Sequence, residues 1–211
     1  QMVKLILRGY GKVANDHPIG PSQQFYASEL PQREYDPEKA KYHMKKSRIG
    51  DHVFKLHAAD AAFGGAVDAA ALYKESAAKA GIKIEVVREP NDGYWSNVWM
   101  KKPWSTCFWS GRPTADWMFS TAYSADAKWN DSFWKHDRFN KLIIEARAML
   151  DKKKRREMYV EMQKIVRDEG GVVVPMYADY MAATSKKVKF ENPAGNFPLD
   201  GHKNTERWWF G

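Results

Sequence analysis

Cysteine is nearly absent from this 211-residue sequence, which contains only Cys107. A single thiol excludes an internal disulfide and a zinc site built from several cysteines. Cys107 lies between Thr106 and Phe108, in a segment that we expect to be a buried strand. We therefore interpret it as a small core residue and not as a nucleophile.

Long apolar runs and a leader segment are absent as well. No stretch of about 18 apolar residues occurs, so the sequence predicts no membrane-spanning helix. No signal peptide opens the sequence, and the first expected helix, residues 2–10, begins without a capping residue. Such a start is what a cut inside a longer protein would give, and we expect any signal peptide to lie upstream.

Signatures of enzymes are missing too. The six histidines include no i, i+4 pair around a glutamate and have no companion cysteines, and there is no GxSxG, GxGxxG or Walker-type loop. Asp16 and His17 are adjacent, but two neighbours alone are a weak signal for catalysis. We therefore expect neither an enzyme nor a bound metal or cofactor, and we interpret the methionines of the later helices as core fillers.

Positive charge and aromatic residues are, in contrast, abundant. Hydrophobic residues make up 44% and aromatic residues 14% of the chain, which predicts a folded protein. The formal net charge of +8 would attract polyanions. The one dense basic run, residues 152–156, lies where two expected helices meet. We interpret this run as a solvated helix start, and a nucleic-acid patch is the alternative.

Periodicity and turn residues predict a chain of alternating helices and strands. Helices are expected at residues 2–10, 36–47, 67–80, 94–100, from 114 onward, at 139–150 and at 158–166, and strands at 53–58, 83–87, 105–109 and 172–177. The helix at 67–80 is long enough to be a crossover, so the strands on either side of it should run parallel. The apolar run 172–177 is typical of a central strand. The pattern predicts an α/β fold with one mixed sheet flanked by helices.

The strongest candidate binding residues follow the expected strand 105–109. Trp109 ends that strand, Ser110 begins a loop in which the backbone can approach a ligand, and Arg112 presents a planar cation. Ligands of open α/β sheets bind at this end of the strands, and Thr114 should cap a helix whose positive end faces the same loop. Arg112 therefore predicts binding of a carboxylate, phosphate or sulfate.

Several neighbours complete the candidate site. Asp116 is a candidate partner for an ammonium group, although an exposed Arg112 paired with Asp116, or with nothing, is the alternative. The other candidates are aromatic or imidazole side chains: Trp117, Tyr94, Trp95 and His17. The aromatic ones are also interpretable as core, because Trp95 and Trp99 share one helix face. With Lys101 and Lys102 beside them, these rings would also suit a single-stranded nucleic-acid-binding module, which is the alternative function.

Three ordered stretches carry a family resemblance. They are YDPEKAK at residues 35–41, then GIKIEVV, NDGYWSNVW and FWSGRPTADWMFS within residues 81–120, then DKKKRREMY and VEMQKIVRDEGGVVVPMY at residues 151–177. In this order they resemble the carboxyl-terminal half of the family 5 extracellular solute-binding proteins. These are the oligopeptide, dipeptide and nickel binding components of ABC importers.

The resemblance implies the carboxyl-terminal lobe of a two-lobed, type II periplasmic binding protein. Residues 1–178 would form that lobe, and residues 179–211, with the aromatic end at 208–210, would return to an amino-terminal lobe that is missing here. The family implies a protein that is periplasmic or otherwise extracytoplasmic, is monomeric when full length and binds no nucleic acid. Its partners would be a small-molecule solute and an ABC permease in the inner membrane.

One position departs from the peptide-binding members of that family. Those proteins carry an acidic residue three positions after the matching tryptophan, where it pairs with the α-ammonium group of the ligand. This chain has Arg112 at that place. The changed sign predicts an anionic solute instead of a peptide, such as an opine-like or modified amino-acid conjugate or a phosphorylated sugar derivative.

Overall fold

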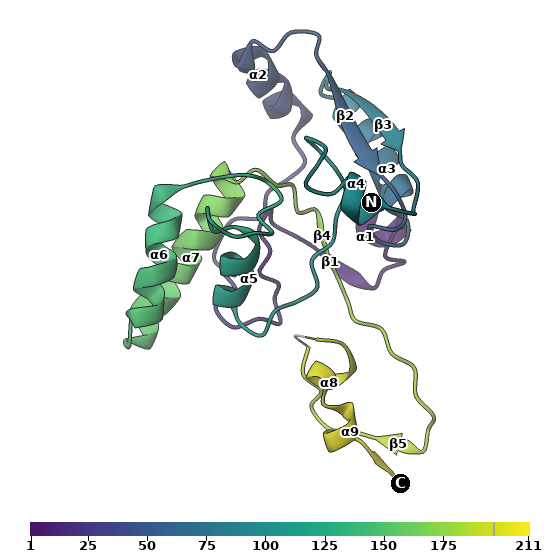
Figure 1. Cartoon of the computed structure of the whole chain (residues 1–211), viewed down its shortest axis with the longest axis vertical. Helices are drawn as coiled ribbons and strands as arrows, with labels where there is room; N and C mark the ends of the chain where they lie inside the picture. The colour runs from purple at the N-terminus through teal and green to yellow at the C-terminus, as the bar shows by residue number, and fades with distance from the viewer. Residues whose placement is uncertain (196) are drawn as a thin grey trace. The chain divides into compact units, whose positions relative to one another are not determined.

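A computed structural model describes residues 1–195 and 197–211, and the chain divides into two compact units (Figure 1). Unit 1 consists of Gln1–Gly9 and Gln32–Phe108, and unit 2 of Tyr10–Pro31 and Trp109–Gly211. Helices and strands occur in both units, which confirms the α/β class. The described strands form three separate two-stranded sheets and do not join into one mixed sheet.

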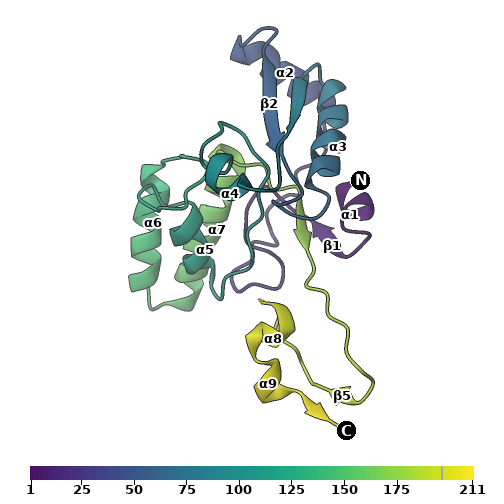
Figure 2. The same cartoon turned by 45° about the vertical axis from the view of Figure 1, so that its right-hand side comes forward.

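Unit 1 is built on a strand, helix, strand unit. Strand β2 (Val53–Ala58) pairs in parallel with β3 (Lys83–Arg88), and Val53 lies opposite Lys83. Helix α3 (Ala66–Ala78) connects the two strands and lies along them in Figure 2. Its small side chains allow close packing, and Ala70 shares a buried cluster with Leu56 and Ile84. The parallel pairing confirms the prediction.

Three short helices accompany this unit: α1 (Met2–Leu5), α2 (Pro37–Ser47) and α4 (Tyr94–Asn97). Asp36 caps α2 at the start of the helix expected over residues 36–47, because its carboxylate accepts a 2.8 Å hydrogen bond from the Lys39 amide. Helix α4 ends three residues earlier than predicted. Met100 adopts a positive φ of 56°, a conformation that cannot continue a right-handed helix.

The predicted strand at residues 105–109 is wrong. Ser105 forms only an isolated parallel bridge to His57 of β2, and irregular chain follows. The Tyr94 hydroxyl donates to the Thr106 carbonyl at 2.6 Å, and among the described residues no strand pairs with residues 106–109. Cys107 is consequently half-buried in irregular chain and not in a buried strand.

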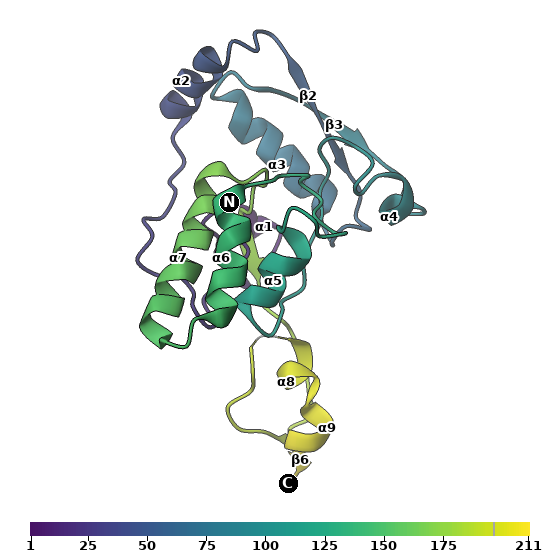
Figure 3. The same ribbon diagram turned by 60° about the vertical axis from the view of Figure 1, so that its left-hand side comes forward.

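Unit 2 has a helical core made of α5 (Ala115–Ala122), α6 (Asp137–Ala148) and α7 (Lys152–Glu169). The last two, at residues where two helices were expected, form a helical hairpin, with α5 beside it (Figure 3). Phe119, Phe139, Leu142, Met162 and Val166 are among the side chains buried between these helices.

Side-chain caps begin two of these helices. Thr114 accepts a hydrogen bond from the Trp117 amide and caps α5 as predicted. Asp151 accepts one from the Lys154 amide and caps α7, a cap that was not predicted. Residues 152–154 are exposed, which confirms a solvated helix start for them, whereas the last two residues of the basic run, 155 and 156, are half-buried.

Strand β1 (Gly11–Val13) pairs antiparallel with β4 (Met176–Ala178). The prediction of a strand at 172–177, covered on both faces, is wrong for residues 172–175, and Val173 is 51% exposed. Beside them Asp16 has a positive φ of 55°, and its carboxylate accepts the Val174 amide at 3.0 Å. The Asp16 amide donates in turn to the Val174 carbonyl at 3.3 Å, so a mixed pair of side-chain and backbone bonds continues from β1 and β4 in place of a regular ladder.

The carboxyl-terminal segment contains β5 (Val188–Lys189), α8 (Pro198–His202), α9 (Asn204–Arg207) and β6 (Trp209–Phe210), with β5 and β6 antiparallel. Its aromatic end finds a partner within the segment, because the Trp208 ring stacks on Phe190 at 4.7 Å. The buried Asp200 accepts hydrogen bonds from Arg207 and from the Trp208 indole. That residues 179–211 return to another lobe stays a prediction.

Candidate functional site

The loop between Trp109 and Thr114 holds Arg112 in one pose. Its Nη1 donates to the Ser110 carbonyl at 2.9 Å, to the Ser110 hydroxyl at 3.1 Å and to the Gly111 carbonyl at 3.2 Å. The guanidinium carbon lies 5.4 Å from the centre of the Trp109 ring, which is a cation–π distance.

The outer part of this guanidinium has no protein partner. All three hydrogen bonds use Nη1, and in the described part of the chain no carboxylate forms an ion pair with Arg112. Nε and Nη2 therefore remain as donors in the fork geometry that suits an oxyanion. The arrangement could hold an anionic group without a metal or a cofactor.

Three segments distant in sequence hold this loop in place. The Gln23 side chain donates to the Arg112 carbonyl at 3.2 Å, and the Tyr180 hydroxyl accepts the Gly111 amide at 2.8 Å. The Trp109 indole donates to Asp131 at 3.1 Å. Sequence reasoning missed all three, because nothing local marks a residue that supports a remote loop.

A second aromatic ring borders the Trp109 ring. Trp129 lies 6.2 Å from it, centre to centre, with the ring planes tilted by 48°, and Trp129 is largely exposed. The only sequence signal was the polar and aromatic composition of residues 124–134, which we expected to be a loop.

Asp116 pairs with Arg147 and not with Arg112. The Arg147 Nε donates to the Asp116 carboxylate at 2.8 Å, and a second nitrogen of the same guanidinium donates to Ser120. Trp117, next to Asp116 on α5, is 53% exposed. An ammonium ligand at Asp116 would therefore compete with a guanidinium that is already bound.

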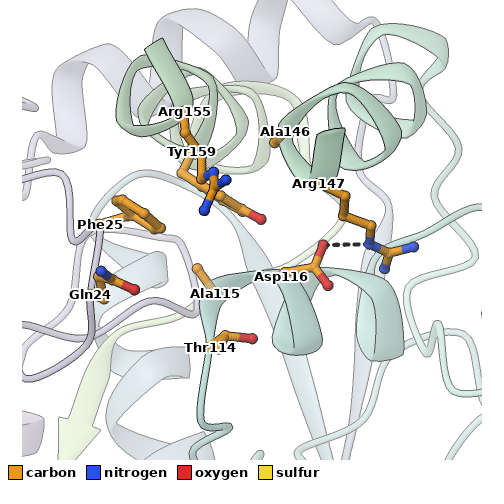
Figure 4. A pocket seen from close by; sticks show the side chains of 9 residues that line it. All are labelled: Gln24, Phe25, Thr114, Ala115, Asp116, Ala146, Arg147, Arg155 and Tyr159. Carbon is orange, nitrogen blue, oxygen red and sulfur yellow. Dashed lines mark hydrogen bonds and ion pairs between the residues drawn. The ribbon is translucent and has the colours of Figure 1, made fainter. Parts of the chain in front are cut away.

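Asp116 also lines a pocket of about 280 Å³ within unit 2, between α5, the ends of α6 and α7, and the loop at Phe25 (Figure 4). The Arg155 side chain points into this space, and its Nε donates to the Met149 carbonyl at 2.6 Å. Tyr159 stacks on Phe25 with ring centres 4.8 Å apart. Burial, followed by the negative charge of Asp116, raises the pKa of Tyr159 to about 12, so its phenol is neutral at physiological pH.

His17 is a core residue of unit 2, with 0% of its surface exposed. The Tyr177 hydroxyl donates to the His17 carbonyl at 2.7 Å and lies 3.3 Å from the imidazole Nδ1. Burial, with a contribution from Arg167, lowers the pKa of His17 to about 4. The structure therefore places a neutral imidazole in the interior and not on a ligand-facing loop.

The remaining two candidates belong to unit 1. Tyr94 is 1% exposed, and its hydroxyl is bound to Thr106, so it is part of the core. Trp95 is 41% exposed and contacts the Trp99 and Phe108 rings edge to face at 5.6 and 6.2 Å. Trp109, Ser110 and Arg112 are thus the predicted residues that the structure brings together.

Among residues 1–195 and 197–211, no three histidine, cysteine, aspartate or glutamate side chains gather in a way that would hold a metal ion. No helix in the same residues combines the length and the apolar character that crossing a bilayer requires.

Solved structures of binding proteins share this fold. DppA from Helicobacter pylori, in complex with the peptide STSA, is 19% identical with a TM-score of 0.73 and covers 99% of this chain and 41% of its own. NikZ from Campylobacter jejuni, in complex with Ni(L-His), is 15% identical with a TM-score of 0.75, over 98% of this chain and 45% of its own. AgaA from A. tumefaciens R10, in complex with agropinic acid, is 18% identical with a TM-score of 0.76, and the match covers 100% of this chain and 44% of the AgaA chain.

This chain therefore spans less than half the length of the structures it matches, as expected for one lobe of a two-lobed protein. No curated protein sequence matches it. Residues 1–131, more than half of the chain, match the model of the bacterial extracellular solute-binding proteins, family 5 Middle. The chain belongs to the family 5 bacterial extracellular solute-binding proteins.

Proposed function

We propose that this chain is part of the solute-binding component of an ABC importer and that Arg112 binds an anionic group of the solute. The observation that carries the proposal is the guanidinium whose Nη1 is fixed by its own loop while Nε and Nη2 have no acceptor among the described residues. A cation held in this way loses little conformational entropy when an oxyanion binds it.

Solute capture would be non-covalent, with no chemical step and no cofactor. Residues 1–178 would form the carboxyl-terminal lobe, and residues 179–211 would return to an amino-terminal lobe that supplies the remaining contacts. Binding would favour a closed form, because the solute contacts both lobes only when they close. The full-length protein would be a periplasmic or extracytoplasmic monomer that delivers the solute to a permease in the inner membrane.

The solute class follows from the sign of the charge at Arg112. Trp109 provides an apolar wall beside the cation, so an anionic group next to a flat or apolar portion fits best. AgaA was solved with agropinic acid and NikZ with Ni(L-His), so proteins of this fold are not confined to peptides. An opine-like or modified amino-acid conjugate or a phosphorylated sugar derivative remains the proposed class.

Calorimetry on the full-length protein tests the proposal, with opines, phosphorylated sugars and neutral peptides as titrants. The anionic solutes should bind, and Arg112→Ala should weaken their binding at least about tenfold, because a charge-assisted hydrogen bond contributes about 1.5–3 kcal/mol. Arg112→Lys should restore only part of the affinity, since lysine lacks the fork.

Arg88→Ala is the matched control. Arg88 is an exposed arginine at the end of β3, and its removal causes the same loss of charge. It should leave the affinity unchanged. Equal affinities of the wild type and of Arg112→Ala, or a preference for neutral peptides, would remove Arg112 from the site.

A further inference from the structure

The pocket lined by Asp116, Arg147, Arg155 and Tyr159 contains more positive than negative charge. Two of its lining side chains are guanidinium groups and one is a carboxylate. The carboxylate, Asp116, is bound by Arg147 at 2.8 Å. Arg155 is therefore the excess cation of the pocket.

Arg155 is tethered but not neutralised. Its Nε donates to the Met149 carbonyl, which ends the preceding helix, and in the part of the chain that the structure describes no carboxylate forms an ion pair with it. Figure 4 shows the guanidinium reaching into the pocket between Phe25 and Tyr159. The tether fixes one nitrogen and leaves the terminal nitrogens facing the space.

We propose that this pocket is a binding site for a small oxyanion, with Arg155 as its principal cation. Phosphate, sulfate and a short carboxylate share the chemistry that a guanidinium fork recognises. The site does not include Arg112, so it is separate from the proposed solute site.

The other groups of the pocket suit such an anion. The neutral Tyr159 hydroxyl interacts with Asp116 and would turn its proton toward a bound anion, and the amino-terminal turn of α5 contributes Thr114 and Ala115 at the positive end of the helix dipole. The volume of about 280 Å³ lies just below the range of about 300–1,000 Å³ that is typical of sites for larger organic ligands. A small anion fits this space better than a peptide or a nucleotide does.

Titration with sodium phosphate tests the site in the purified protein. Thermal unfolding and calorimetry are performed at constant ionic strength, with sodium chloride as the balancing salt and with sulfate and acetate as parallel titrants. A saturable rise in the melting temperature with at least one of the three oxyanions, beyond the effect of chloride, is expected. Comparing the three identifies which oxyanion the site prefers, and an effect equal to that of chloride overturns the proposal.

Substitutions assign that effect to the pocket. Arg155→Gln should lower the affinity for the preferred oxyanion about tenfold or more, and Arg155→Lys should cause a smaller loss because it retains the charge. Tyr159→Phe, which keeps the ring on Phe25 but lacks the hydroxyl, should lower the affinity severalfold. It tests the site even if loss of the Met149 contact unfolds the Arg155 variants.

Lys152→Gln is the control for diffuse electrostatics. Lys152 is an exposed cation at the start of the same helix as Arg155, and its substitution removes the same charge. The affinity for the oxyanion should not change in this variant. An equal loss in Lys152→Gln and Arg155→Gln, or no loss in Tyr159→Phe and the Arg155 variants, contradicts a site in the pocket.

Discussion

Burial of His17 in the core of unit 2 makes the stability of the fold depend on pH. Its side chain is completely buried, and burial disfavours the charged imidazolium, which lowers its pKa from 6.5 to about 4. In the unfolded chain the imidazole is in water and titrates near its ordinary value. The unfolded state therefore binds more protons than the folded state between about pH 4 and pH 6.5.

The free energy of unfolding should consequently fall as the pH is lowered from about 6.5 to about 4. The contribution of His17 is complete above pH 6.5 and amounts to about 3 kcal/mol, because each unit of pKa shift corresponds to about 1.4 kcal/mol. Urea unfolding at several pH values measures this slope.

His17→Asn should flatten the pH profile in that window, since asparagine does not titrate. His43→Asn changes an exposed histidine and should leave the profile as in the wild type. Parallel profiles for the wild type and His17→Asn would show that the imidazole does not carry the pH dependence.

Helix α7 begins at a side-chain cap, Asp151, the residue just before its first turn. The Asp151 carboxylate accepts a hydrogen bond from the Lys154 amide at 2.9 Å. Asp151 lies in the short connection between α6 and α7. It also places a negative charge at the positive end of an 18-residue helix that begins with three lysines. The cap therefore has both a hydrogen-bonding and an electrostatic role.

Asp151→Ala should lower the free energy of unfolding by about 1 kcal/mol, the usual loss for an N-cap. Chemical denaturation measures the change, and Asp151→Asn should retain most of the stability because its amide oxygen can still accept the hydrogen bond. Asp92→Ala, at an exposed aspartate, is the control. A similar loss in both alanine variants would argue against a specific cap.

Elements with strong local signals were predicted in the right order and type, although α7 begins six residues before the predicted helix 158–166 and α1 ends five residues before the end of the predicted helix 2–10. The cap at Asp36, the parallel β2 and β3 and the helical hairpin α6 and α7 all follow from residues a few positions apart. The segments 105–109 and 172–175 were mistaken for strands because apolar composition alone does not show whether a partner strand is available. Tyr94 and Asp16, which occupy backbone groups there, come from other parts of the chain.

At the level of the molecule, the proposed solute site is shared between two lobes, and these 211 residues would supply one side of it. The chain covers less than half of each of these related structures, and Trp109, Ser110 and Arg112 are the residues proposed for this side of the site. Affinity falls steeply when half of the contacts are lost, because the entropic cost of binding remains.

The chain expressed by itself should therefore bind the solute of the full-length protein weakly or not detectably. Calorimetry on both proteins with the same anionic solute makes the comparison. Circular dichroism first establishes that the isolated chain is folded. Submicromolar binding of a small solute by the isolated chain would contradict a site that needs a second lobe.

The part of the site that could be predicted lies within four residues of sequence. Trp109, Ser110 and Arg112 are close because the chain makes them neighbours, and the sign of Arg112 is readable without a fold. His17 and Tyr94 were also proposed as ligand contacts, but the structure places both in the core. No helical or strand period covers residues 11–35, so burial of His17 could not be read from the pattern.

Local sequence thus determines the caps, the helices and the order of elements, since these depend on backbone groups a few residues apart. Tertiary structure alone decides the partners of the charged groups. Asp116 meets Arg147 across 31 positions, Gly111 meets Tyr180 across 69 and Arg112 meets Gln23 across 89. Ion pairs depend on distance in space and not on distance along the chain. Because Asp116 pairs with Arg147, it does not neutralise Arg112, whose guanidinium is the proposed contact for the solute.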